Sequence, residues 1–267
     1  MLAHFLYPIL FVLGLSIISG PIGSFMIWRK MTFFGETLAH GTLVAFLLQY
    51  ITHWPLALCM SVVVLAYALV LEFLERQKGD YLSIMPILSY GVMGLSLLIT
   101  ETGIKQPKMV YRVFLGDLLL TQYQDCVALF ILAGVIIAST VRWYRPFLLL
   151  LFSRELAFLH YRNIHLLSFF MNMLMGLSVT MTVQSIGMLL AMALLTLPSL
   201  IASNWSRHPW QMIILGSLIA CGSSIIGFAV SLWQNWPTGP TITVILLIAY
   251  IISDLLKKVA NSRVESF

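Results

Sequence analysis

Apolar segments of about twenty residues recur from one end of the chain to the other, with little polar sequence between them. A helix needs about 20 mostly apolar residues to cross a bilayer. The segments that satisfy this rule lie near 7–28, 36–52, 55–74, 82–100, 125–141, 164–181, 185–203, 210–232 and 240–256. The pattern predicts an all-α, polytopic integral membrane protein with eight to nine transmembrane helices, in which residues 1–267 form a single transmembrane domain.

The composition supports this fold class and leaves no room for a sizeable soluble domain. Charged residues make up 9% of the chain, against about 25% in an average soluble domain. The mean hydropathy is +0.96. The net charge of +5 does not indicate nucleic-acid binding, because basic residues in a membrane protein first mark the cytoplasmic loops.

The basic residues predict the orientation of the chain. If the turn at Arg29–Lys30 faces the cytoplasm, alternation of nine spans places twelve of the fifteen basic residues on that side. Only Lys105, Lys108 and Arg112 then fall outside. The positive-inside bias therefore predicts an N-terminus outside and a C-terminus in the cytoplasm.

Two apolar runs are too short to span a bilayer. Met109–Leu120 is expected to be re-entrant or interfacial, and Phe147–Phe152 interfacial. The latter belongs to the longest predicted cytoplasmic stretch, Arg142–Arg162. There Ser153 is a good N-cap and Glu155 falls in the first turn, where its charge suits the helix dipole. This predicts a short surface helix at the membrane boundary, or else an ordinary interfacial connector.

Glu36 and His40 are the ionisable pair that lies deepest in a predicted span. They are four residues apart and share one helix face. Both can bind zinc, manganese or iron(II), and ionisable groups inside a bilayer are costly and usually functional. Two ligands are too few for a tetrahedral site, whereas a symmetric dimer would supply two Glu and two His. The alternative is a structural bridge between the two side chains.

Motifs for enzyme chemistry are missing from the sequence. It contains no GxxxxGK[ST] phosphate loop and no HExxH, GxSxG or GxGxxG. We therefore expect a protein that is not an enzyme, and any ATP hydrolysis must come from a partner subunit. Cys59, Cys126 and Cys221 form no CxxC pair and are expected to be lone buried thiols.

Four stretches resemble the membrane permeases of bacterial metal (zinc, manganese or iron) ABC importers, above all the zinc-uptake permease. They are GPIGSFMIWRKMTFFGETLAHGTL at 20–43, FLGDLL at 114–119, SRELAF at 153–158, and IGMLLAMALLTLPSLIA at 186–202 followed by WPTGPTITV. The resemblance covers almost the whole chain. It implies a permease of the bacterial inner membrane that carries a divalent metal ion, zinc before manganese or iron, as its transported substrate and holds no permanent cofactor.

The resemblance also implies partners and site residues. It implies a second permease copy, expected to form a homodimer, two cytoplasmic ATPase subunits and an external metal-binding protein. Glu36 and His40 match the acidic–x–x–x–His positions of the metal path, and Asp117 matches an accessory acidic residue. The ATPase-coupling region spans about 142–163, and its contact residues are Ser153, Arg154, Glu155, Leu156, Ala157 and Phe158.

The chain departs from the family pattern at two positions. Glu36 stands where Asp is usual, and Tyr90 stands where some zinc permeases carry His. Other functions remain open besides a manganese or iron permease. One is a stand-alone secondary transporter or channel, although the chain shows no clear pair of matching halves. Another is a purely structural membrane subunit.

Overall fold

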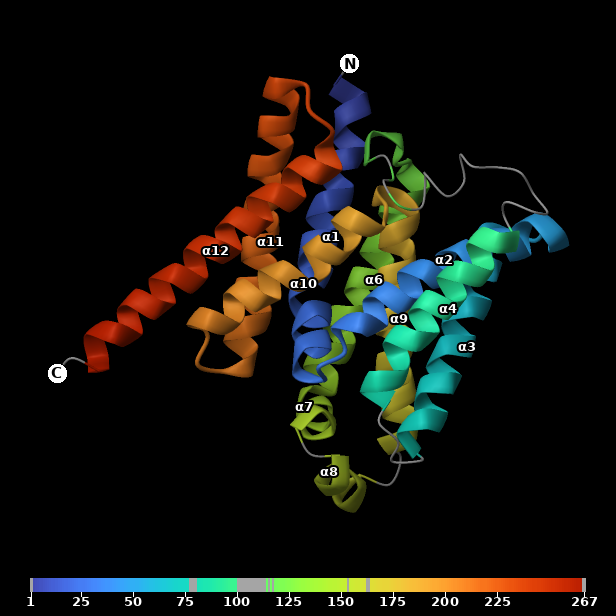
Figure 1. Ribbon diagram of the computed structural model, residues 1–267, viewed down its shortest axis with the longest axis horizontal. Coiled ribbons are helices and arrows are strands. Elements are labelled where there is room, and N and C mark those ends of the chain that lie inside the picture. Colours follow the sequence, from blue (N-terminus) through green and yellow to red (C-terminus); the bar gives the residue numbers. More distant parts are fainter. Residues whose placement is uncertain are drawn as a thin grey trace.

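The computed structural model describes residues 2–76, 81–99, 114, 116, 118–152, 154–161 and 164–265, and the regular elements within these ranges are all helical (Figure 1). The helices are α1 (Leu2–Trp28), α2 (Thr32–Thr52), α3 (Leu56–Arg76), α4 (Tyr81–Ile99), the 3-10 turn η2 (Leu118–Leu120), α6 (Tyr123–Arg142), α7 (Tyr144–Phe152), α8 (Arg154–His160), α9 (Ile164–Ile186), α10 (Met188–Trp205), α11 (Pro209–Gln234) and α12 (Thr238–Glu265).

The all-α, polytopic prediction is confirmed in its coarse form. Within the described ranges, seven helices are long and apolar enough to cross a bilayer: α1, α3, α6, α9, α10, α11 and α12. Helix α2 is not among them because it carries Glu36, His40 and several small polar residues. In α4 the apolar part found is the shorter stretch Pro86–Leu98. Eight or nine spans therefore stay a prediction.

One boundary between predicted segments is shifted. The sequence placed these segments near 164–181 and 185–203, whereas α9 continues to Ile186 and the chain turns at Gly187. Two threonine hydroxyls near this boundary are bonded inside the helix. Thr180 donates to the Gly176 carbonyl at 3.0 Å and Thr182 to the Ser178 carbonyl at 2.5 Å. Back-bonding of this kind lets Thr remain in a helix.

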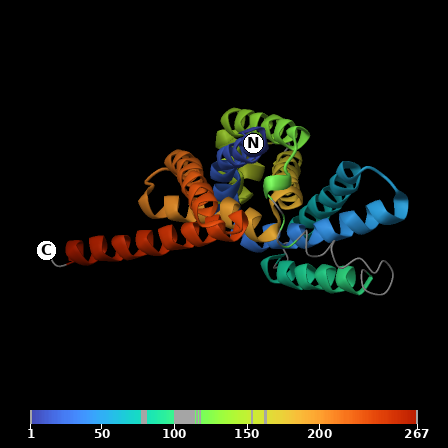
Figure 2. The same cartoon turned by 90° about the horizontal axis from the view of Figure 1, so that it is seen from above.

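Helix α1 lies at the centre of the bundle and packs against α6, α10 and α11 (Figure 2). Close approach depends on Gly20 and Gly23. A Cβ added at Gly20 would lie 2.1 Å from the Ile213 carbonyl oxygen, and one at Gly23 would lie 2.0 Å from the Leu195 carbonyl oxygen. Small residues at helix crossings allow such backbone contact in membranes.

A proline inside α1 explains a further link to α11. Pro21 has no N–H, so the Ile17 carbonyl loses its partner within the helix. The Ser217 hydroxyl of α11 donates to that carbonyl at 3.2 Å. Satisfying a freed carbonyl from a neighbouring helix is how bilayers accommodate proline.

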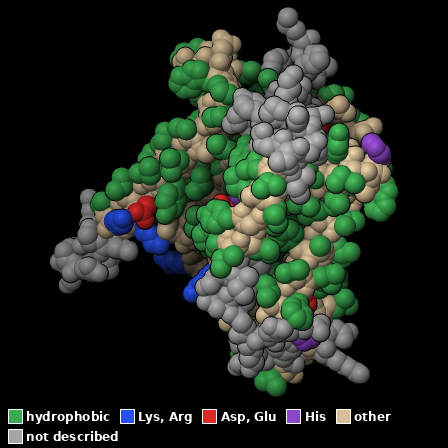
Figure 3. Space-filling model, turned by 45° about the vertical axis from the view of Figure 1, so that its right-hand side comes forward, with side chains coloured by type: hydrophobic (Ala, Val, Ile, Leu, Met, Phe, Trp, Pro, Cys, Tyr) green, Lys and Arg blue, Asp and Glu red, His purple; other side chains and the backbone are tan. Residues whose placement is uncertain are grey.

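The exterior of the bundle fits a lipid environment. Among the described side chains on the face in Figure 3, hydrophobic ones predominate and charged ones are few. Helices α7 and α8 lie at the end of the molecule opposite the N-terminus (Figure 1). Cys59 and Cys126 are buried, Cys221 is half-buried, and all three are free thiols.

Candidate functional site

Helix α2 places Glu36 and His40 on one face, as their spacing predicts. The His40 Nε2 to Glu36 Oε1 distance is 3.9 Å, which is too long for a hydrogen bond. The His40 side chain is 3% exposed and that of Glu36 is 35% exposed. His40 Nδ1 is buried and has no hydrogen-bond partner among the described residues. An imidazole nitrogen without a partner is unusual in a protein interior and is suited to a ligand.

Neighbouring helices enclose the face of α2 around this pair. The Tyr67 ring of α3 lies against Gly41, where an added Cβ would come within 3.1 Å of it. On another side, Met192 of α10 lies against Gly35, with its sulfur 3.0 Å from an added Cβ. The ring of Phe114 lies 6.2 Å from that of His40, centroid to centroid. His40 therefore lies in a packed, mostly apolar surrounding.

The segment that carries Phe114 is held by two glycines. Gly116 has φ +58° and Gly187, between α9 and α10, has φ +79°. A Cβ added at Gly116 would lie 2.2 Å from both Gly187 N and Ile186 C. The backbones touch here, so the FLGDLL stretch, the start of the IGMLLAMALLTLP stretch and His40 form one assembly. Sequence reasoning treated these motifs separately, although both glycines stand inside them.

A second contact missed from the sequence joins the α1–α2 turn to α9. Arg29 donates from Nη1 to the Asn172 side-chain oxygen. Asn172 is fully buried, and Lys30 beside Arg29 adopts a left-handed backbone with φ +56°. The turn that precedes the Glu36–His40 helix is thus fixed to the neighbouring helix by a charged side chain.

Asp117, the other predicted ligand, lies outside the described residues. Tyr90 on α4, at the position where the sequence departs from the family pattern, is 60% exposed. Within the described part of the chain no group of three or more His, Cys, Asp or Glu side chains could hold a metal ion. Among the described residues, Glu36 and His40 therefore form an incomplete ligand set.

The predicted coupling region is helical where the sequence places a helix. Helix α8 begins at Arg154 and Ala157 is fully buried, whereas Leu156 is 47% and Leu159 81% exposed. Ser153 lies outside the described residues, as do the side chains of Arg154, Glu155 and Phe158. A short helix is therefore present at Arg154–His160.

The family model described as "ABC 3 transport family" matches residues 3–257. The chain belongs to this family. Its relatives include the high-affinity zinc uptake system membrane protein ZnuB of Haemophilus influenzae, which is 26% identical over 93% of this chain and 96% of its own length. ZnuB of Buchnera aphidicola subsp. Baizongia pistaciae is 28% identical over 91% of this chain and 94% of its own.

A manganese transport protein and a solved structure are also similar to this chain. The manganese transport system membrane protein MntC of Listeria monocytogenes is 25% identical over 90% of this chain and 86% of its own. A solved structure, PsaBC from Streptococcus pneumoniae in complex with Fab, superposes with a TM-score of 0.79 and 18% identity, covering 94% of this chain and 90% of that one. This likeness supports the fold of the helical bundle.

Proposed function

We propose that the chain is the membrane-spanning permease of an ATP-driven importer that carries a divalent metal ion, zinc first, into the cytoplasm. Membership of a transport family over residues 3–257 sets the class. The observation that carries the metal assignment is the pair of Glu36 and His40, with His40 buried and its Nδ1 unbonded among described residues. Zinc is favoured because the ZnuB relatives span nearly the full chain.

The incomplete ligand set supports a dimeric permease. Glu36 and His40 alone cannot surround zinc, which takes four ligands. A second copy related by a two-fold axis would supply two more, and the partial exposure of Glu36 leaves one carboxylate accessible for such sharing. Asp117 is proposed as an accessory ligand. The metal is transported cargo in this scheme, with no permanently bound cofactor.

ATP hydrolysis is assigned to cytoplasmic partner subunits that contact α8. Leu156 and Leu159 are exposed on this short helix and offer an apolar contact surface to a partner. The region around 142–163 would transmit the ATPase stroke, with Ser153 to Phe158 at its centre. Metal would arrive on an external binding protein. The inner-membrane orientation, N-terminus outside and C-terminus cytoplasmic, rests on the basic-residue bias and on the N-terminus lying opposite α8.

Metal uptake by cells that lack their own zinc importer tests the proposal. We expect His40→Ala and Glu36→Gln to abolish growth rescue under zinc limitation while the permease still co-purifies with its ATPase. His208→Ala is the matched control, because His208 is exposed at the start of α11. Rescue by all three variants would remove the metal role from Glu36 and His40.

Manganese is the second candidate cargo, because the MntC relatives of Listeria also cover most of the chain. Carboxylate and imidazole ligands accept either ion, and also iron(II). Rescue under separate zinc, manganese and iron limitation would decide between them. Co-elution of an ATPase with the purified permease separates all of these from a secondary transporter that works alone.

A further inference from the structure

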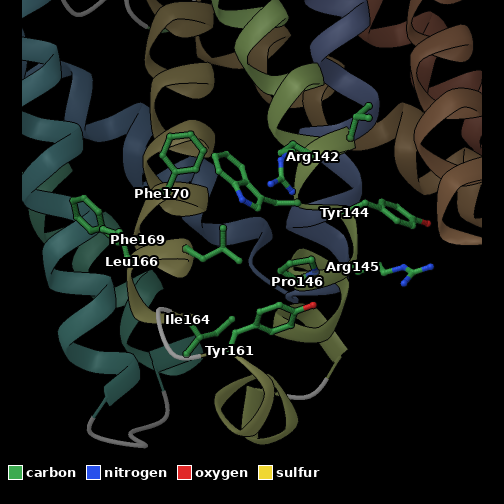
Figure 4. Close-up of a pocket in the computed structure, with 12 residues that line it drawn as sticks. Arg142, Tyr144, Arg145, Pro146, Tyr161, Ile164, Leu166, Phe169 and Phe170 are labelled. Atoms are coloured by element: carbon green, nitrogen blue, oxygen red, sulfur yellow. The ribbon is translucent and has the colours of Figure 1, made fainter.

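A large hollow opens on the same end of the molecule as α8, away from Glu36 and His40. Its volume is about 1070 Å³. The end of α6, the start of α7, Tyr161 and the first two turns of α9 line it (Figure 4). Figure 4 shows Phe169 and Phe170 along one wall, and Arg145 extending away from them on the other side.

The lining combines an apolar wall with positive charge. Phe169, Phe170, Leu166 and Ile164 form the wall on α9, and Arg142 and Arg145 supply two guanidinium groups. None of the described lining residues is acidic. Among the described side chains, neither Arg142 nor Arg145 forms an ion pair. The nearby carboxylate of Glu72 is engaged with His165 of α9, at 2.7 Å.

Aromatic side chains mark the hollow as a membrane–water boundary. Trp143 packs edge-on against Phe170, with ring centroids 5.4 Å apart, and Tyr144 packs edge-on against Trp210 at 5.4 Å. Trp and Tyr concentrate at the headgroup level of a bilayer, and Arg near helix ends reaches toward the phosphates. Arg142 is the last residue of the spanning helix α6. The hollow therefore extends from the headgroup region into the acyl region.

We propose that this hollow binds an anionic phospholipid of the leaflet on this side. The phosphate would lie by Arg142, with Arg145 adding positive charge at the rim, and the acyl chains would lie along Phe169, Phe170 and Leu166. Charge complementarity favours an anionic headgroup over a zwitterionic one. A lipid also explains the depth of the apolar wall, since Phe170 lies roughly 9 Å along α9 from its start at 1.5 Å per residue. An ATPase that stays in water does not extend so deep.

Quenching of Trp143 by brominated phospholipids tests the proposal. The full chain is placed in phosphatidylcholine vesicles that contain equal fractions of brominated phosphatidylglycerol or brominated phosphatidylcholine. The difference between the wild type and Trp143→Phe isolates the signal of Trp143. We expect the anionic lipid to associate roughly fivefold better, the factor typical of one basic side chain at an anionic surface. Added salt should reduce this preference.

Variants of the arginines provide the controls. Arg142→Gln should lose most of the preference and Arg142→Lys should keep it, because Lys retains the charge. Arg207→Gln is the matched control, since Arg207 is exposed in the α10–α11 turn, outside this hollow. Equal quenching by the two lipids in the wild type would overturn the proposal. So would loss of the quenching when the partner ATPase is added, because the ATPase would then be the occupant.

Discussion

Replacing Gly116 by alanine should uncouple the segment beside His40 from the α9–α10 turn. Gly116 has φ +58°, a conformation that costs an L-residue with a Cβ about 1–2 kcal/mol. The new Cβ would also lie 2.2 Å from Gly187 N and from Ile186 C. These are backbone atoms that cannot rotate away. Together the two effects should lower the free energy of unfolding by about 2 kcal/mol or more.

The measurement is the melting temperature of the purified permease, paired with metal uptake. A loss of about 2 kcal/mol should lower the melting temperature by about 4–8 °C in a chain of this size. Uptake should fall as well, because Phe114 would leave the ring of His40. Gly134→Ala is the matched control, since nothing lies within 4 Å of its added Cβ in α6. If both alanine variants melted and transported alike, the close contact between Gly116 and Gly187 would be refuted.

Three further predictions concern single contacts. Ser217→Ala should lower the free energy of unfolding by about 1–2 kcal/mol, because the Ile17 carbonyl freed by Pro21 loses its donor. The control Ser61→Ala removes only a bond within its own helix and should melt like the wild type. An equal loss of stability in both variants would contradict a special role for the bond from Ser217 to Ile17. Leu159→Glu should reduce co-purification of the ATPase. It should leave the melting temperature unchanged, because Leu159 is 81% exposed. ATPase binding retained at the level of the exposed control His208→Glu would exclude α8 as the contact. Arg29→Gln should lower the melting temperature, because Arg29 donates a hydrogen bond to the buried Asn172. Lys30→Gln, at the exposed neighbouring residue, should leave it unchanged. An unchanged melting temperature in both variants would show that the Arg29–Asn172 bond contributes nothing to stability.

The positions of most spanning helices along the chain could be predicted from the sequence. Each of them needs an apolar segment of about 20 residues, and such segments are visible in the sequence. The expected segments near 55–74, 125–141 and 210–232 coincide with α3, α6 and α11. The boundary predicted between the segments near 164–181 and 185–203 lies a few residues later, because Thr180 and Thr182 satisfy their hydroxyls on the preceding helical turn and α9 continues to Ile186. Side-chain back-bonding leaves no signal in a hydropathy profile.

The candidate site was only partly predictable. The i,i+4 spacing placed Glu36 and His40 on one face of α2, since the helical period determines that relation. The contact of Gly116 with Gly187 joins residues 71 positions apart in the sequence. The hydrophobic periodicity of the sequence does not indicate such a contact. The only sequence signal was glycine itself inside two motif stretches, because glycine is the residue that permits both a positive φ and touching backbones.

The helix that carries the site is one that lipid alone would stabilise poorly. Glu36 and His40 lower the hydropathy of α2, and ionisable groups in a bilayer are costly unless protein surrounds them. Helix α2 accordingly packs against α1, α3, α4, α9 and α10, and His40 is almost fully enclosed. Glu36 keeps 35% of its side chain exposed in the single chain. A carboxylate at that depth requires water, cargo or a second copy beside it, so its exposed edge is where the metal path and the dimer axis of the proposed importer should meet.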